Sequence, residues 1–374
     1  MKSRRDVLIA LPMLGAASLV ARVAHGAPAV LSAPASGLLN AKDMGARGDG
    51  ATDDTQALLA ALATGRSIFL PAGNYLISST LSFARDGQYL MGEGKGTETV
   101  VENRRTAAPL FSFSTGSGRN ARLRCGLSRL AFKGNRDTQA GILLRGIKDD
   151  GLVGSADKAC FIEDVAVTGV GAGYALRVSS WANEIRGLEI DGCDAGVLLG
   201  SEANANLFNT LYISRCRREA VVTLHNARPT NNTFVNSVAQ YCGGEFATVH
   251  INGCDVLQFM GLYLEGNTAP TNVLLDTASR TCRLQSLSYN QVSGTSGAPV
   301  VTVRGRGHTI DGVLQIAGES DCLVRLEAGA VGNSVSGLTV AGGHVRSGAC
   351  VDASGRSDNL IRLAARAGRG WDLS

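Results

Sequence analysis

The chain has 374 residues with 47 glycines, only 8 prolines and 5% aromatic residues, and its formal net charge is +4. Residues 1–26 carry a net charge of +3, so the rest of the chain is close to neutral. A near-neutral chain without a basic run lacks the electrostatic surface that nucleic-acid binding requires. Abundant glycine with few aromatics is typical of many short strands joined by tight turns, or of an array of stacked units.

The N-terminus has the pattern of an export signal. The pair Arg4-Arg5 runs into an apolar stretch at residues 7–20, and small residues precede a plausible cleavage site before Ala27. The apolar stretch is too short to span a bilayer comfortably. The pair is similar to a twin-arginine signal; an ordinary secretory signal or an uncleaved anchor is the alternative. We expect a signal peptide at 1–26, a linker at 27–39, and a periplasmic or secreted protein with no membrane contact after cleavage.

The segment GARGDGATDDTQALL at residues 45–59 holds three aspartates, Asp49, Asp53 and Asp54. They could form a metal or acid–base site, but their spacing is not that of an EF-hand loop. A helical pattern begins directly after Asp54, with Thr52 or Asp53 placed as its N-cap. The pattern therefore favours a structural role, at the start of a helix over residues 54–63.

An apolar residue recurs through most of the chain at intervals of 23 to 26 residues. We call these the lead residues: Ile162, Ile185, Phe208, Phe234, Phe259, Leu284, Ile310, Val335 and Ile361. Each unit also holds a second short alternating strand, such as Val197–Leu199, Val222–Leu224, Val249–Ile251, Val301–Val303 and Val324–Leu326.

This repeat predicts an all-β fold, a right-handed parallel β-helix (solenoid) of about 9–11 coils. An open end of such a stack exposes apolar residues, so we expect the helix at 54–63 to cap the first coil. The predicted boundaries are 40–115 for the cap and first coils, 116–365 for the β-helix and 366–374 for a C-terminal tail.

The nine cysteines contain no Cys-x-x-Cys pair. Cys193, Cys216 and Cys242 each follow a lead residue by eight positions, and Asn267 holds the same offset in the next coil. We expect a column of packed thiols; a disulfide or a soft-metal site is the alternative.

Three segments together resemble the N-terminal region of the pectate lyase superfamily: GARGDGATDDTQALLAAL, IFLPAGNYLI and LMGEGKGTETVV. That superfamily of right-handed β-helix proteins includes polysaccharide lyases, hydrolases, epimerases and phage tailspike depolymerases. The resemblance implies an exported lyase or hydrolase acting on an acidic polysaccharide. The alternative is a non-catalytic glycan-binding or structural β-helix. The catalytic motifs of polygalacturonases, calcium-dependent pectate lyases and mannuronan epimerases are absent, so no catalytic set is carried over.

Outward positions of the second strand bring acid–base residues together. One expected column reads Ser179, Gly200, His225, Asn252, Asp276, Arg304 and Glu327, and its neighbour reads Arg177, Leu198, Thr223, His250, Leu274, Thr302 and Arg325. A uronate lyase needs a base at the C5 proton and a cation at the carboxylate. We therefore predict catalytic roles for His225, His250, Asp276 and Arg304, with Arg177 and Asn252 binding substrate. The alternative is a solvated polar face.

The first strand predicts a second outward surface, on which Tyr212, Tyr263 and Glu265 would bind a sugar chain. Ordinary strand tyrosines are the alternative. No residues are predicted to bind a metal and no cofactor is expected, although a loop with Asp137, Asp149 and Asp150 could bind calcium; an exposed acidic turn is the alternative. The expected partner is a polysaccharide, with no nucleic acid, and the chain could form an oligomer.

Overall fold

The computed structural model describes residues 37–115, 121–146, 156–291 and 298–363. Internal contacts divide the chain into two units, Met1–Gly37 and Leu38–Ser374, and the description below concerns the second. The predicted signal peptide, the predicted tail at 366–374, and Asp149 and Asp150 lie outside the described residues. The domain boundaries therefore stay predictions.

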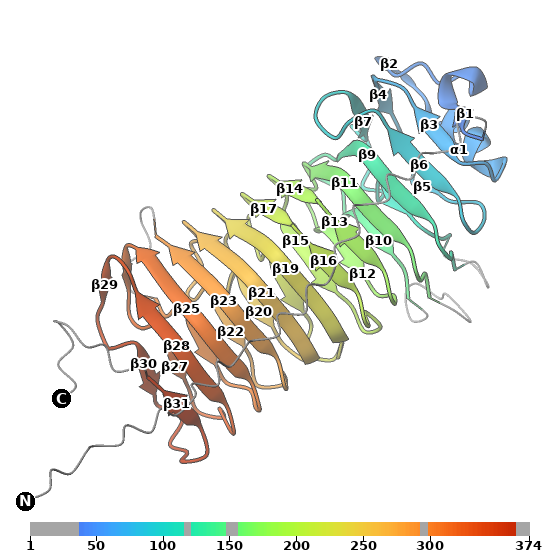
Figure 1. Cartoon of the computed structure of the whole chain (residues 1–374). Helices are drawn as coiled ribbons and strands as arrows, with labels where there is room; N and C mark the ends of the chain where they lie inside the picture. The colour runs from blue at the N-terminus through green and yellow to red at the C-terminus, as the bar shows by residue number, and fades with distance from the viewer. Residues whose placement is uncertain (1–36, 116–120, 147–155, 292–297, 364–374) are drawn as a thin grey trace, which may run out of the picture. The chain divides into compact units, whose positions relative to one another are not determined.

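The lead residues form one column of a parallel sheet, as the repeat predicts. Ile162 pairs with Ile185, Ile185 with Phe208 and Phe208 with Phe234, and the pairing continues to Ile361. The rings of Phe208 and Phe234 stack with centroids 4.3 Å apart. Figure 1 shows the strands of successive coils side by side. The fold is thus a parallel β-solenoid, and its lead residues lie in one continuous apolar core.

An 18-stranded sheet carries the first strands of the coils. Its strands are β1 (Leu39–Asn40), β2 (Asp49–Asp53), β3 (Ile68–Leu70), β4 (Gly73–Leu76), β6 (Tyr89–Gly92), β7 (Thr99–Glu102), β9 (Gly126–Lys133), β11 (Phe161–Thr168), β13 (Glu184–Arg186), β14 (Glu189–Asp191), β16 (Leu207–Asn209), β17 (Tyr212–Ser214), β19 (Thr230–Gln240), β21 (Asp255–Glu265), β23 (Arg283–Asn290), β25 (Thr309–Ala317), β28 (Ser334–Val340) and β31 (Leu360–Arg362).

An 11-stranded sheet carries the second strands. Its strands are β5 (Leu81–Ser82), β8 (Phe111–Ser112), β10 (Ala140–Leu144), β12 (Tyr174–Val178), β15 (Ala195–Leu199), β18 (Val221–Thr223), β20 (Val249–Ile251), β22 (Val273–Leu275), β24 (Val301–Val303), β27 (Val324–Leu326) and β30 (Cys350–Asp352). A further pair joins β26 (Glu319–Ser320) to β29 (His344–Val345). The stack has about 12 turns, slightly more than the 9–11 predicted.

Each regular coil bends at the second position after its lead residue. The backbone there takes a positive φ in every coil from β11 to β28, for example 62° at Gly187, 49° at Asn236 and 76° at Gly261. Glycine and asparagine tolerate this conformation best. Part of the glycine-rich composition is therefore required by the bend between two strands of one coil.

A ladder of buried asparagines runs two positions before the lead residues, and the sequence analysis missed it. Asn206 Oδ1 accepts hydrogen bonds from the backbone N of Asn183 at 3.0 Å and from its Nδ2 at 2.8 Å. Asn232 repeats the arrangement for Asn206. His308 holds the same position in a later coil, where its Nδ1 accepts from the backbone N of Cys282 at 3.0 Å. These side chains satisfy buried backbone groups between coils.

The second-strand prediction was wrong by one residue at β18. The structure places the strand at Val221–Thr223, and Val222 rather than Thr223 pairs with His250. Val221 and Val222 are both apolar, so alternation alone could not settle the register. The Thr223 hydroxyl donates to the Asn252 carbonyl and accepts from its amide, which lets threonine occupy the inward position. Leu224 is consequently 50% exposed.

The helix predicted at 54–63 is present as α1 (Thr55–Ala63), preceded by a short 3-10 helix η1 (Ala41–Met44). Asp54 is the N-cap residue, but its carboxylate accepts from the backbone N of Arg47 and Gly48 instead. The carboxylate of Asp53 accepts from the Thr55 backbone at 3.0 Å. Asp49 closes its own turn by accepting from Thr52 at 2.7 Å. All three aspartates thus bind backbone amides, which supports their structural interpretation.

The predicted cysteine column is present. The backbone N of Arg217 donates to the Cys193 carbonyl, and the backbone N of Gly243 donates to the Cys216 carbonyl, so the turns stack in register. Cys193, Cys216 and Cys242 are buried and free. Burial raises the pKa of Cys193 to about 11, which keeps this thiol protonated at neutral pH. These are packed thiols in this structure.

Among the residues that the structure describes, no helix is long and apolar enough to cross a membrane.

Candidate functional site

Three predicted catalytic residues meet on the outward face of the 11-stranded sheet. His250 lies on β20, and Asp276 and Arg304 directly follow β22 and β24. The Nε2 atom of His250 is 3.0 Å from Asp276 Oδ2, and the Nη1 atom of Arg304 is 3.8 Å from Asp276 Oδ1. The Nε atom of Arg304 donates to Glu327 Oε2 at 2.7 Å. One chain of polar contacts thus spans four neighbouring coils, from His250 to Glu327.

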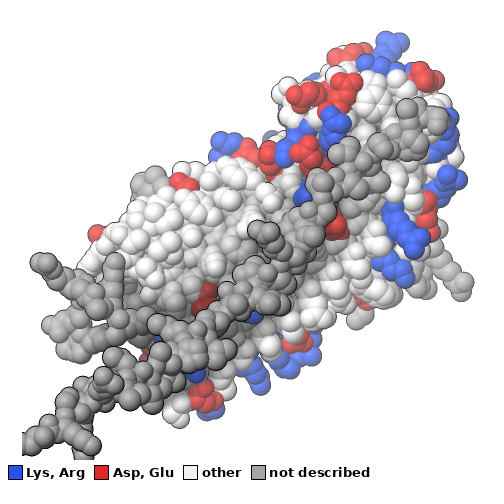
Figure 2. Space-filling view, in the orientation of Figure 1, with Lys and Arg blue, Asp and Glu red and all other residues white. Residues whose placement is uncertain are grey.

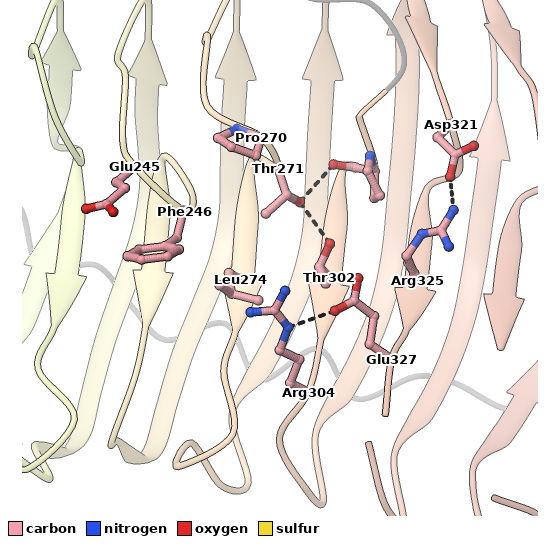
Figure 3. A pocket seen from close by; sticks show the side chains of 11 residues that line it. Glu245, Phe246, Pro270, Thr271, Leu274, Thr302, Arg304, Asp321, Arg325 and Glu327 are labelled. Carbon is pink, nitrogen blue, oxygen red and sulfur yellow. Dashed lines mark hydrogen bonds and ion pairs between the residues drawn. The ribbon is translucent and has the colours of Figure 1, made fainter. Parts of the chain in front are cut away.

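A groove of about 450 Å³ lies beside this chain (Figure 3). Its floor comes from outward side chains of β22, β24 and β27, and one wall comes from the turns that precede the strands. The lining residues are Glu245, Phe246, Pro270, Thr271, Leu274, Pro299, Thr302, Arg304, Asp321, Arg325 and Glu327. The groove therefore combines four apolar side chains, most of them from the turns, with two arginines and three carboxylates.

The two arginines are held by different partners. Figure 3 shows Arg304 bonded to Glu327 and Arg325 bonded to Asp321. A hydrogen bond from Ser347 and the contact with Arg325 lower the pKa of Asp321, so this carboxylate stays charged well below neutral pH. Arg325 is oriented by Asp321, and Arg304 by Glu327 with Asp276 at a longer distance, while the remaining N–H groups of both can donate elsewhere. Such groups can bind the carboxylates of an acidic chain.

His250 itself does not line the groove. Its side chain is buried, with 8% of its surface exposed, and the ring of Phe246 packs on it at a centroid distance of 5.4 Å. Phe246 does line the groove and is 49% exposed. The aromatic ring thus separates the imidazole from the groove. His250 and Asp276 therefore reach the groove only through Arg304, or after Phe246 moves.

The other predicted residues of this sheet lie apart from the His250 chain of contacts. Leu224, and not His225, occupies the position that the alignment assigned to His225, because of the register of β18. His225 is exposed, and its Nδ1 lies 3.2 Å from Asn252 Oδ1. Arg177 on β12 lies three strands from His250, about 14 Å by strand spacing.

Tyr212, Tyr263 and Glu265 lie on the 18-stranded sheet, so they do not line the groove. Their predicted columns are correct: Tyr212 pairs with Val238 and Val238 with Tyr263, while Glu265 pairs with Gln240. They form a separate surface.

Within the described ranges, no group of three or more His, Cys, Asp or Glu side chains is placed to hold a metal ion. Asp137 is exposed and contacts only Arg136 among the ion pairs of the described residues. A calcium site on that loop stays an untested expectation.

Sequence reasoning missed the groove residues Phe246, Asp321, Arg325 and Glu327 as site residues. Arg325 and Glu327 occupy predicted outward columns, so a signal for them was present. Phe246 and Asp321 lie in turns of variable length, where the repeat carries no positional information.

The region before the regular coils matches a known family. Residues 38–117 match the model of the rhamnogalacturonase A/epimerase, pectate lyase-like family. This match covers the segments whose resemblance to the pectate lyase superfamily is visible in the sequence.

Two curated relatives from Azotobacter vinelandii resemble the chain. Mannuronan C5-epimerase AlgE3 is 39% identical over 125 residues, and alginate lyase 7 is 43% identical over 75 residues. The matches cover 28% and 17% of this chain but only 6% and 8% of those proteins. Each match therefore covers only a small part of the relative's length.

Among solved structures, the chain is similar to the A-module of the Azotobacter vinelandii mannuronan C-5 epimerase AlgE4. The TM-score is 0.59 at 17% sequence identity, with 86% of this chain and 99% of that module covered. At this identity the similarity concerns the fold, which is shared over nearly the whole stack.

Proposed function

We propose that the protein acts on an acidic polysaccharide that lies along the 11-stranded sheet, as a lyase or a hydrolase. The observation that carries the proposal is the position of Arg304, which lines the groove and contacts both Asp276 and Glu327. A guanidinium in this position can bind a uronate carboxylate and stabilise the negative charge that develops when the C5 proton is removed. The named relatives, a mannuronan epimerase and an alginate lyase, support an acidic substrate.

In the lyase reaction, His250 is the proposed base. The Nε2–H group of the imidazole donates a hydrogen bond to Asp276. The unprotonated Nδ1 atom is then the one that removes the C5 proton. The bond from C4 to the glycosidic oxygen then breaks, a C4–C5 double bond forms, and that oxygen takes the proton that His250 Nδ1 removed from C5. For this contact the ring of Phe246 has to turn away from His250.

A hydrolase would instead use two carboxylates. Asp276 and Glu327 follow strands two coils apart, about 10 Å by strand spacing. The two carboxylates both contact Arg304, which brings them closer than their backbones. An inverting hydrolase needs a separation of roughly 6.5–9.5 Å. The pair is compatible with that geometry.

The second candidate function is binding without catalysis. One specific observation favours it: His250 is buried behind Phe246 and does not line the groove. In that case the two groove arginines would bind the chain and no bond would break.

The deciding experiment incubates the purified protein with polymannuronate, polyguluronate and polygalacturonate in D₂O. Ultraviolet absorbance reports the unsaturated uronate of a lyase, reducing ends report hydrolysis, and deuterium at C5 reports proton removal without cleavage. A signal in the first or second assay is expected. Binding without a signal in any of the three assays would favour the non-catalytic binding protein over the enzyme. If the protein neither binds nor converts these polysaccharides, both proposed functions are rejected.

Further proposals concern export and the ends of the stack. We propose that residues 1–26 direct twin-arginine export and are removed, supported by the Arg4-Arg5 pair before an apolar stretch. N-terminal sequencing of periplasmic protein tests the export: an intact residue 1, or retention in the cytoplasm, contradicts it.

The coil is proposed to be right-handed, as crossovers between parallel strands almost always are. The proposed cap of the stack is α1, whose Leu58 and Leu62 are buried in the core.

A further inference from the structure

Three tyrosines on the 18-stranded sheet are anchored in the same way. Tyr212 lies on β17, Tyr241 directly follows β19, and Tyr263 lies on β21. The hydroxyl of each tyrosine is hydrogen-bonded to a residue one coil further along the stack. Tyr212 accepts from Gln240, Tyr241 donates to Glu265 at 3.4 Å, and Tyr263 accepts from Asn290 at 3.0 Å. We call these three side chains the tyrosine row.

The anchoring residues form a single column of the sheet. Gln240 pairs with Glu265, and Glu265 pairs with Asn290, so the hydroxyls are fixed at successive strand intervals of about 4.8 Å. A ring held at both its Cβ and its hydroxyl loses little conformational freedom when a ligand packs on it. The regular anchoring therefore makes a preorganised aromatic surface and not a set of independent side chains.

Two rings of the tyrosine row are exposed and Tyr263 is half-buried; β19, β21 and β23 carry few outward charges, while Arg215 beside Tyr212 is paired with Asp191. Tyr212 is 39% exposed and Tyr241 is 46% exposed. The outward positions next to the row on β19, β21 and β23 include Val235, Val238, Met260, Gln285 and Ser288. Figure 2 shows few charged side chains over β19, β21 and β23, in contrast to the N-terminal strands. The Glu265 carboxylate raises the pKa of Tyr241, so this hydroxyl stays protonated and uncharged.

We propose that the tyrosine row is a second carbohydrate-binding surface, which takes a chain of uncharged sugar residues. The C–H faces of a sugar ring carry partial positive charge and complement the negative face of an aromatic ring. Tyr212 and Tyr263 are two strands apart, about 10 Å, a distance comparable to the length of a disaccharide. Gln240, Asn290 and Glu265 offer the polar groups that sugar hydroxyls need at the rim.

The charges of the tyrosine row favour a different ligand from the one that the groove would bind. Glu265 places a negative charge in the middle of the row, and its carboxylate would repel a uronate. The groove carries Arg304 and Arg325, which attract one. The row also lies on the other sheet, so it goes beyond the proposed function and does not depend on catalysis there. A polysaccharide with acidic and neutral segments could occupy both surfaces.

The test measures binding by calorimetry with hexasaccharide probes of glucose, mannose and xylose, and with a hexamannuronate. At least one neutral probe is expected to bind, and Tyr212→Ala and Tyr263→Ala should each weaken it at least tenfold while the thermal midpoint is unchanged. Arg304→Ala should leave neutral binding intact, even if the groove proves to have no function. Leu360→Ala removes an exposed side chain of the same sheet, on β31 and away from the row, and is the matched control.

Three results would overturn the proposal. The first is that no neutral probe binds, and the second is that the tyrosine variants bind as well as the Leu360→Ala control. The third comes from sedimentation velocity: if the protein self-associates and the tyrosine variants are monomeric, the row is a contact between copies of the chain and does not bind sugar.

Discussion

The Nε2 atom of His250 lies 3.0 Å from the Oδ2 atom of Asp276, on the next coil of the stack. The two residues are 26 positions apart in sequence, and the repeat brings them together. Arg304 extends the contact by one more coil to the groove. The first two predictions concern this chain of contacts.

Replacing His250 by glutamine should abolish most of the activity if the imidazole is the base. A general base contributes roughly 100-fold or more, so kcat should fall by at least that factor. His225→Gln is the control: His225 is bonded to Asn252 and has no contact with Asp276, so its replacement should leave kcat nearly unchanged. Steady-state rates on the responsive polysaccharide decide. If the His250 variant had the wild-type kcat, His250 would not be the base and would have only a packing role.

Replacing Arg304 by alanine should lower kcat/KM by roughly 100- to 1000-fold, the usual effect of removing one donor to a developing negative charge. Arg304→Lys should retain only part of the wild-type kcat/KM, because an ammonium group cannot contact Asp276 and Glu327 in the way that the planar guanidinium does. Arg283→Ala removes an exposed arginine of the 18-stranded sheet and should have no effect. Equal losses in both alanine variants would show that Arg304 contributes only general charge.

The asparagine ladder should be a major source of stability. Asn206→Ala removes the acceptor for two Asn183 groups and the donor to the Ser180 carbonyl, all buried. Leaving such groups unpaired costs about 1–3 kcal/mol each, so the free energy of unfolding should fall by about 3 kcal/mol. Urea denaturation measures it. Asn209→Ala, three residues away on the outer face, should change it by less than about 0.5 kcal/mol; equal effects would contradict a special role for the ladder.

Asp157 should make stability fall as pH rises. Burial raises the pKa of its carboxyl to about 6, although the backbone amides of Arg122 and Arg145 donate to it. The folded state therefore holds a proton that the unfolded state releases between about pH 4 and pH 6. Across that window the contribution of Asp157 should decline by about 3 kcal/mol, at 1.36 kcal/mol per pKa unit.

The measurement compares wild type with Asp157→Asn by urea denaturation at several pH values in that window. The variant lacks the titrating group, so the advantage of the wild type should shrink as pH increases. Two curves that stay parallel would show that Asp157 titrates normally.

Several positions that proved important were readable from the repeat. The bend glycines at Gly187, Gly261, Gly312 and Gly337 all follow a lead residue by two, and the ladder asparagines all precede one by two. The apolar lead position alone reveals neither the glycines nor the asparagines. Once one column of a stack is aligned, every other column with the same offset is aligned as well.

The candidate site was only partly predictable, for a different reason. The contact from His250 to Asp276 follows from the columns, but the displacement of His225 depends on one register choice at Val221 and Val222. The turn residues Phe246 and Asp321 form part of the groove. Because turns differ in length between coils, no offset from a lead residue locates them.

The amino-acid sequence by itself determined the repeat, its period, the columns of the 18-stranded sheet and the structural role of the three early aspartates. Inward apolar and turn positions must satisfy the same backbone requirements in every coil, so they leave a periodic trace. Only the tertiary structure decided which outward side chains share a groove and which one Phe246 covers. Turn paths and side-chain rotamers follow from packing between coils, and the repeat does not encode either.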